Sequence, residues 1–187
     1  MKLKMHFQLN SMLILILSVL LLQGCSSMKI EDYKGQTPKL DLFDYFSGKT
    51  KAYGQFQDRS GMVIRRFEVD IVGTVNEAGN TLTLEEDFIY NDGEEQRRVW
   101  VIKRTEDGRY IGTAGDVIGE ANGQIVGNAL NWAYTLDLPY KDSSIHVQFD
   151  DWMYLHNDDV MLNRAEVKKF GFRVGEVTLF FSKKLAE

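Results

Sequence analysis

Apolar and polar residues alternate along much of the chain after residue 49, which is the pattern of β-strands with one buried face. Residues 63–75 show it most clearly, with apolar side chains recurring at alternate positions on one face. Residues 82–90 and 126–138 repeat the pattern, whereas residues 99–102 are apolar on both faces and cannot be oriented by it. The alternation predicts strands whose inward faces share one core.

Turn-forming residues divide these strands. Asn-Gly and Asp-Gly pairs are strong hairpin signals because their central residues tolerate a positive φ. Eight turns separate nine candidate strands, which are rich in β-branched and aromatic residues. The turns are predicted at residues 58–61, 76–80, 91–93, 106–108, 122–123, 139–143, 157–159 and 171–175.

Consecutive hairpins predict an all-β fold, an antiparallel meander closed as a lipocalin-like up-and-down barrel of about 8–9 strands. Closure removes the two free edges and the exposed apolar face of an open sheet. A two-sheet sandwich is the alternative. Charges on both faces of residues 63–75, such as Arg65 and Arg66, argue against a membrane-spanning barrel. Glycines expected within strands, where they mark bends or bulges, are Gly112, Gly115, Gly119 and Gly127.

The N-terminal 24 residues differ from the rest of the chain. A basic start is followed by residues 12–22, an apolar run in which Ser18 is the only polar residue. That run is shorter than the roughly 17–25 residues needed to span a bilayer. A signal peptide over residues 1–24 is therefore predicted, with an uncleaved membrane anchor as the alternative.

Two further parts follow the predicted signal peptide. Residues 25–40 are polar and predict a tether without strong secondary structure. Residues 41–187 predict the β-barrel domain. Its first residues, 41–46, predict one helical turn in which Leu42, Phe43 and Phe46 plug one end of the core.

Residues 22–25, Leu-Gln-Gly-Cys, resemble the lipobox of bacterial lipoproteins. The resemblance implies that the thiol of Cys25 receives a diacylglyceryl group and that the chain is cut just before it. Cys25 is the only cysteine, so the mature chain would have no free thiol. Acylation of the new N-terminus would add a further chain, and two or more chains anchor a protein stably. Ser26 after the cysteine favours the outer membrane, with the domain facing the periplasm.

Composition excludes some functional classes. The chain has 22 Lys and Arg against 27 Asp and Glu, a formal net charge of −5. A nucleic-acid partner is not expected, because binding phosphates needs a basic surface. An aromatic content of 12% is too high for a disordered chain.

Four segments, residues 65–74, 127–139, 149–155 and 164–181, resemble an uncharacterised family of proteobacterial lipoproteins that is defined only as a domain of unknown function. The resemblance extends over nearly the whole mature chain. A looser similarity links it to the calycin group of small ligand-binding barrels. Residues 54–56 read Gly-Gln-Phe where lipocalins carry Gly-x-Trp, so the lipocalin ligand function is not transferred residue by residue.

Neither an enzyme, a cofactor nor a metal site is expected. The chain has no Gly-x-Ser-x-Gly sequence. The adjacent Asp150 and Asp151 would point to opposite faces of a strand, which does not suit paired acid–base catalysis. His146 and His156 lie near opposite ends of a predicted strand, and no cysteine is available to complete a metal site.

Charged and aromatic residues on predicted inward faces are the candidate site. Arg65 and Glu86 each share a face with apolar neighbours, and a buried charge needs a partner or water. They form either structural ion pairs or the polar contacts of a ligand cavity. Trp132 and Tyr134 also point inward, either as core or as cavity lining.

Two functions fit these features. The first is a lipid-anchored lipoprotein whose barrel binds an apolar or amphipathic small molecule such as a lipid, using Trp132, Tyr134, Arg65 and Glu86. The second is a structural or interaction lipoprotein of the envelope, with a packed barrel, no ligand and an unidentified protein partner. A barrel of about eight strands can just be filled by its own side chains, so the sequence leaves both open.

Overall fold

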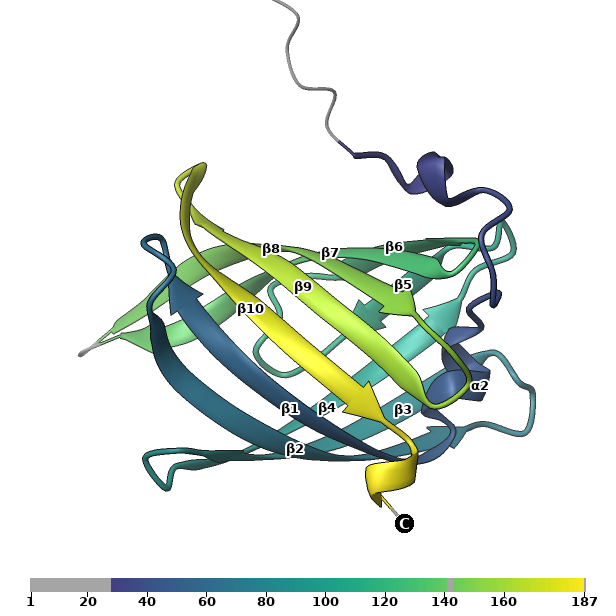
Figure 1. Cartoon of the computed structure of the whole chain (residues 1–187), viewed down its shortest axis with the longest axis horizontal. Coiled ribbons are helices and arrows are strands. Elements are labelled where there is room, and N and C mark those ends of the chain that lie inside the picture. The colour runs from purple at the N-terminus through teal and green to yellow at the C-terminus, as the bar shows by residue number, and fades with distance from the viewer. Residues whose placement is uncertain (1–27, 141–142, 187) are drawn as a thin grey trace, which may run out of the picture.

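The computed structural model describes residues 28–140 and 143–186, which form a closed barrel of antiparallel strands (Figure 1). Each strand pairs with its neighbours in sequence, and β1 pairs with β10 to close the ring. The strands are β1 Gly48–Asp58, β2 Val63–Val75, β3 Thr81–Tyr90, β4 Glu95–Arg104, β5 Tyr110–Thr113, β6 Ala121–Val126, β7 Ala129–Tyr140, β8 Ser143–Leu155, β9 Val160–Lys169 and β10 Phe172–Ser182. The all-β, up-and-down architecture predicted from the sequence is confirmed.

Inward and outward faces follow the predicted alternation. On β2, Val69 and Ile71 are buried in the barrel while Glu68 and Asp70 are exposed outside. Residues 99–102, which the pattern could not orient, place Trp100 and Ile102 inside. The burial of these side chains is what makes one register of each hairpin favourable, because a shift by one residue would reverse the faces.

The barrel has ten strands rather than the predicted 8–9, and the error lies between residues 110 and 129. Asn122 and Gly123 were predicted to form a turn, but they lie within β6. Gly123 serves close packing instead, since an added Cβ would lie 2.2 Å from the ring of Trp132. The real turn is at residues 127–128, where Gly127 has a φ of 60°.

Of the three other glycines that were predicted to lie within strands, one does and two do not. Gly112 lies within β5 as expected, but Gly115 and Gly119 lie in the 114–120 loop between two short strands. This loop continues the barrel wall beside β7. Its contacts are a bridge between Val117 and Leu136 and a hydrogen bond from the Ile118 amide to the Thr135 carbonyl.

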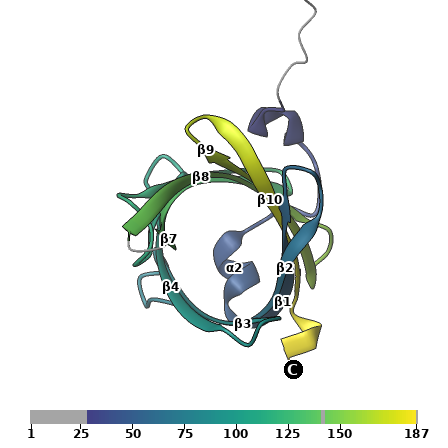
Figure 2. The same ribbon diagram turned by 90° about the vertical axis from the view of Figure 1, so that its left-hand side faces the viewer.

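A short helix, α2 (Leu42–Phe46), seals one end of the barrel, as predicted (Figure 2). Asp41 caps it by accepting hydrogen bonds from the amides of Phe43 and Asp44, and it also pairs with Arg104 at 2.9 Å. The ring of Phe46 packs edge-on against Phe181 on β10, with centroids 5.5 Å apart. The cap and the apolar contacts together hold the helix across the opening.

The predicted tether is partly structured. A 3-10 helix, η1 (Ile30–Tyr33), packs beside β6 and β7, and Ile30 and Leu40 are buried. A second 3-10 helix, η2 (Lys184–Ala186), follows β10. Within the described residues, no helix is both long and apolar enough to cross a bilayer.

The plug generates a test of the fold. An added Cβ at Gly73 on β2 would lie 1.8 Å from the carbonyl oxygen of Phe46, so Gly73→Ala must displace α2. We expect a loss of about 1–3 kcal/mol in the free energy of unfolding, measured by urea denaturation. Gly115→Ala is the matched control because nothing lies within 4 Å of its added Cβ. It should change stability by less than about 0.5 kcal/mol. Equal effects of the two substitutions would contradict the seating of the helix.

Candidate functional site

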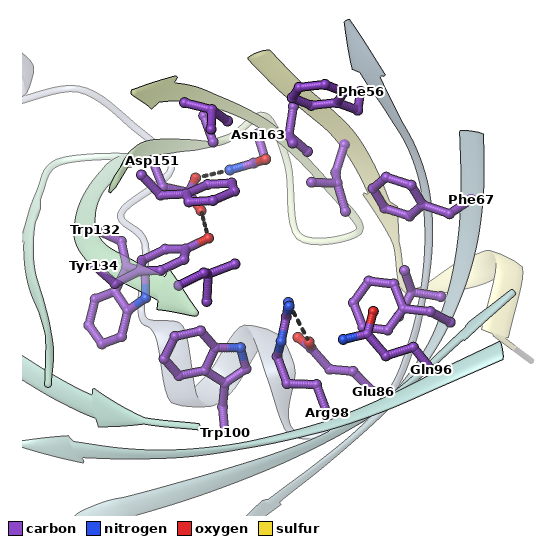
Figure 3. A pocket seen from close by; sticks show the side chains of 18 of the residues that line it. Phe56, Phe67, Glu86, Gln96, Arg98, Trp100, Trp132, Tyr134, Asp151 and Asn163 are labelled. Carbon is purple, nitrogen blue, oxygen red and sulfur yellow. Dashed lines mark hydrogen bonds and ion pairs between the residues drawn. The ribbon is translucent and has the colours of Figure 1, made fainter. Parts of the chain in front are cut away.

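A cavity of about 840 Å³ occupies the interior of the barrel, between α2 and the opposite end (Figure 3). Leu42 and Phe46 of α2 are among the residues at its base. Residues near the β1–β2, β3–β4 and β7–β8 turns line its other end, which forms the mouth; Phe56, Glu94 and Pro139 are among them. Most of the lining is apolar or aromatic. The volume is in the range of small-molecule sites, ~300–1,000 Å³.

An aromatic wall covers one side of this lumen. Trp100 lies edge-on to both Trp132 and Tyr134, with centroids 5.8 and 5.4 Å away, and Tyr134 stacks on Phe149 at 5.0 Å. Trp132 can lie flat against the strands because its neighbours there are glycines, including Gly112. The wall is therefore a packed aromatic surface that still borders open space.

A first polar cluster lies on the wall formed by β3 and β4. Glu86 and Arg98 are register partners, with an oxygen and a nitrogen 4.0 Å apart. Arg98 donates to both carboxylate oxygens of Asp116, at 2.6 to 3.1 Å. Asp116 belongs to the 114–120 loop and is tied to β7 through a hydrogen bond from the Asp137 amide to its carbonyl oxygen. Burial raises the pKa of Glu86 to about 7, although the positive charge of Arg98 opposes the shift.

A second polar cluster lies on β7, β8 and β9. Asp151 is 5% exposed and accepts hydrogen bonds from the amide of Asn163 and, at 3.4 Å, from the hydroxyl of Tyr134. Burial raises the pKa of Asp151 to about 7, and these two donors oppose the shift. Asp150 and Glu86 raise it further through their negative charges. Asp151 makes no ion pair with any residue of the described chain.

The structure brings the sequence-predicted residues to one cavity. Trp132, Tyr134 and Glu86 lie within the lumen, and Arg65 lies at its mouth. Arg65 pairs with Asp92 and Glu94 and stacks over the ring of Tyr90 at 3.5 Å. A role for these residues in ligand binding stays a prediction. Cys25 falls outside the described residues.

Several polar residues of the lumen were missed from the sequence. Arg98 could have been found, because it alternates with Trp100 and lies opposite Glu86 across a hairpin. Asn163 alternates in the same way with buried neighbours on β9. Asp116, which binds Arg98, gave no signal, since it reaches that arginine from a loop. The opposite orientations predicted for Asp150 and Asp151 are confirmed, with only Asp151 buried.

The two histidines that were considered as metal ligands lie apart from this cavity. His146 is exposed and lies 3.4 Å from Asp137 on β7, and His156 is exposed just after β8. In residues 28–140 and 143–186, no three His, Cys, Asp or Glu side chains gather closely enough to hold a metal ion.

The raised pKa of Asp151 leads to a pH-dependent stability. The folded protein keeps Asp151 protonated up to a pKa of about 7, whereas the unfolded chain ionises it near its ordinary pKa of 3.8. The stability that this protonated carboxyl contributes is therefore fully present below pH 4 and is lost as the pH rises through 7. Asp151→Asn should therefore gain stability relative to the wild type between pH 5 and pH 8, as measured by urea unfolding. Glu86 is present in both proteins, so the difference is dominated by Asp151. Asp150→Asn removes a charge that raises the pKa of Asp151, so it should show the same trend with a smaller amplitude. A stability difference that is constant with pH would contradict the burial of this carboxylate.

Comparison with solved structures places the fold among known barrels. A protein of unknown function from the DUF3598 family of Nostoc punctiforme superposes with a TM-score of 0.56 at 12% identity, over 79% of this chain and 50% of that one. The S-type phycobiliprotein lyase of Guillardia theta has a TM-score of 0.50 at 9% identity, over 83% and 92%. An odorant-binding protein is more distant, with a TM-score of 0.37 at 14% identity over 79% and 76%.

The chain thus spans about half the length of the DUF3598 protein. At these identities the likeness concerns the fold alone. No curated protein matches the chain in sequence. A family model does match, over residues 19–183, and the chain belongs to the family described as "Protein of unknown function (DUF3833)".

Proposed function

We propose that this protein binds an apolar or amphipathic small molecule, such as a lipid, inside its barrel. The observation that carries the proposal is the lumen of about 840 Å³, which is sealed by α2 at one end and open at the other. A lumen of this size favours a bound ligand over the alternative of a packed barrel. Its lining combines a largely apolar surface with a few polar groups, as small-molecule sites commonly do.

We further propose that the protein is a lipoprotein of the outer membrane, anchored through Cys25 and facing the periplasm. Met28, the first described residue, lies against the barrel wall, with its sulfur accepting hydrogen bonds from Tyr33 and Tyr154. Cys25 is three residues earlier, a reach of at most ~11 Å. A lipid on Cys25 would therefore hold the barrel close to the bilayer.

Exposed aromatic residues beside the mouth support this placement. Phe170 and Phe172, at the tip of the β9–β10 hairpin, are 86% and 77% exposed, and the basic residues Lys169 and Arg173 flank them. The hairpin tip and η1, near the start of the described chain, both lie along the upper edge of the barrel in Figure 1, at opposite ends of it. Exposed rings beside cationic side chains suit the boundary between acyl chains and anionic headgroups.

Ligand binding is tested by filling the lumen. Val147 on β8 is buried and lines the cavity, so Val147→Trp should occupy ligand space. In the mature chain, residues 25–187 with Cys25→Ser, a bound fatty acid, lysolipid or phospholipid should raise the melting temperature, by mass action on the folded state. Val147→Trp should abolish that rise.

The matched control is Gln148→Trp, the next residue on the same strand, which is exposed on the outer face. It should keep the ligand-induced rise in melting temperature. If no lipid of the panel stabilises the protein carrying only Cys25→Ser, the ligand-binding proposal fails and the partner-binding alternative is favoured.

The anchor is tested in cells by replacing the acylated residue. Cys25→Ser in the full chain should prevent lipidation, leave uncleaved precursor and remove the protein from the outer-membrane fraction. Ser26→Ala is the control and should be processed normally. Mature-length protein in the outer membrane of the Cys25→Ser strain would contradict the proposed anchor.

A further inference from the structure

The second polar cluster lies in the wall of the lumen and has more hydrogen-bond acceptors than donors. Asn163 is 2% exposed, and its amide nitrogen donates to Asp151 while its carbonyl oxygen Oδ1 has no partner in the described structure. Asp151 lies beside it with one long hydrogen bond from Tyr134 and no cation. Both residues line the cavity (Figure 3). A buried acceptor without a donor is costly, so this wall lacks a hydrogen-bond donor.

The cationic side chains that line the described lumen are already paired with acidic residues. Among the described lining residues, the arginines are Arg65 and Arg98. Arg98 is held by three hydrogen bonds to Asp116 and by its charge interaction with Glu86. Arg65, at the mouth, pairs with two acidic residues of the β3–β4 turn. A carboxylate or phosphate that binds Arg98 would have to displace Asp116, whereas at the mouth the buried Nε of Arg65 has no hydrogen-bond partner in the described structure.

From these two observations we infer the chemical class of the ligand. It is an apolar chain that ends in a hydrogen-bond donor without negative charge, either a hydroxyl or an ammonium group. The donor binds Asp151 and the free carbonyl oxygen of Asn163, and the chain lies along the aromatic wall that includes Trp100 and Trp132. This inference rests on the ligand-binding function proposed above and adds which head group the site accepts.

Three ligands with the same ten-carbon chain test the inference: decanol, decylamine and decanoate. Dissociation constants are measured by tryptophan fluorescence on the mature chain carrying Cys25→Ser, at one pH and salt concentration. We expect decanol and decylamine to bind at least tenfold more tightly than decanoate. Decanoate binding as tightly as the other two, or more tightly, would overturn the inference while leaving the ligand-binding function intact. Absence of binding by all three ligands would overturn both.

Substitutions in the two polar clusters should have opposite effects on ligand affinity. Asp151→Asn removes the negative charge and should weaken decylamine about tenfold, with a smaller change for decanol. Asp158→Asn, an exposed carboxylate in the β8–β9 turn, is the matched control and should leave all three affinities unchanged. An unchanged decylamine affinity in Asp151→Asn would overturn the assignment of the donor site.

Asp116→Asn provides a second variant that does not depend on the stability of the Asp151 cluster. It removes the nearer of the two acids that neutralise Arg98, which should then attract an anion more strongly. Decanoate affinity should rise several-fold, and the preference for decylamine should shrink. If decanoate binding does not improve, the pairing of Arg98 with Asp116 is not what excludes anions, and that part of the inference is wrong.

Discussion

Hydrogen bonding between β1 and β10 joins the two ends of the sheet, from Lys51 opposite Ser182 to Asp58 opposite Gly175. This closure gives every strand two partners and forces one face of each strand into a shared lumen. A barrel of about eight strands is just wide enough to be filled by its side chains or to hold one small ligand, and the diameter grows with strand number. Ten strands therefore enclose space that the inward side chains do not occupy, which is the origin of the cavity.

The two ends of the barrel differ because of a small number of local contacts. At one end, α2 lies close to β2 because Gly73 has no side chain to oppose the backbone of Phe46. Its last turn is also held by Lys183, which donates to the carbonyl oxygens of Tyr45 and Ser47. At the other end, among the described residues, the β1–β2, β3–β4 and β9–β10 hairpin turns surround the opening. In the described part of the chain, the barrel is therefore closed by α2 at one end and bordered by hairpin turns at the other.

Polar groups within an apolar lumen are costly unless they have partners, and the two clusters meet that cost differently. Arg98 is fully engaged because the 114–120 loop carries Asp116 to it. Asp151 has only the neutral donors Asn163 and Tyr134, and burial raises its pKa accordingly. A charge that is paired contributes to the wall, whereas acceptors that lack donors are available to a ligand. Under the proposed function, the paired Arg98 belongs to the wall of the lumen and the acceptors without donors bind the ligand.

Alternation and turn residues were enough to predict the strands, the inward faces and the helical plug, because these depend on local backbone preference and on which side chains avoid water. They also placed Glu86, Trp132 and Tyr134 inside the barrel. The strand count failed where Gly123 serves packing against Trp132 rather than a turn, since the two uses of glycine look alike in sequence. Only the tertiary structure decided that the lumen is hollow and which charges meet in it. Those properties depend on the closed circumference and on contacts between segments distant in the chain, and no local pattern encodes either.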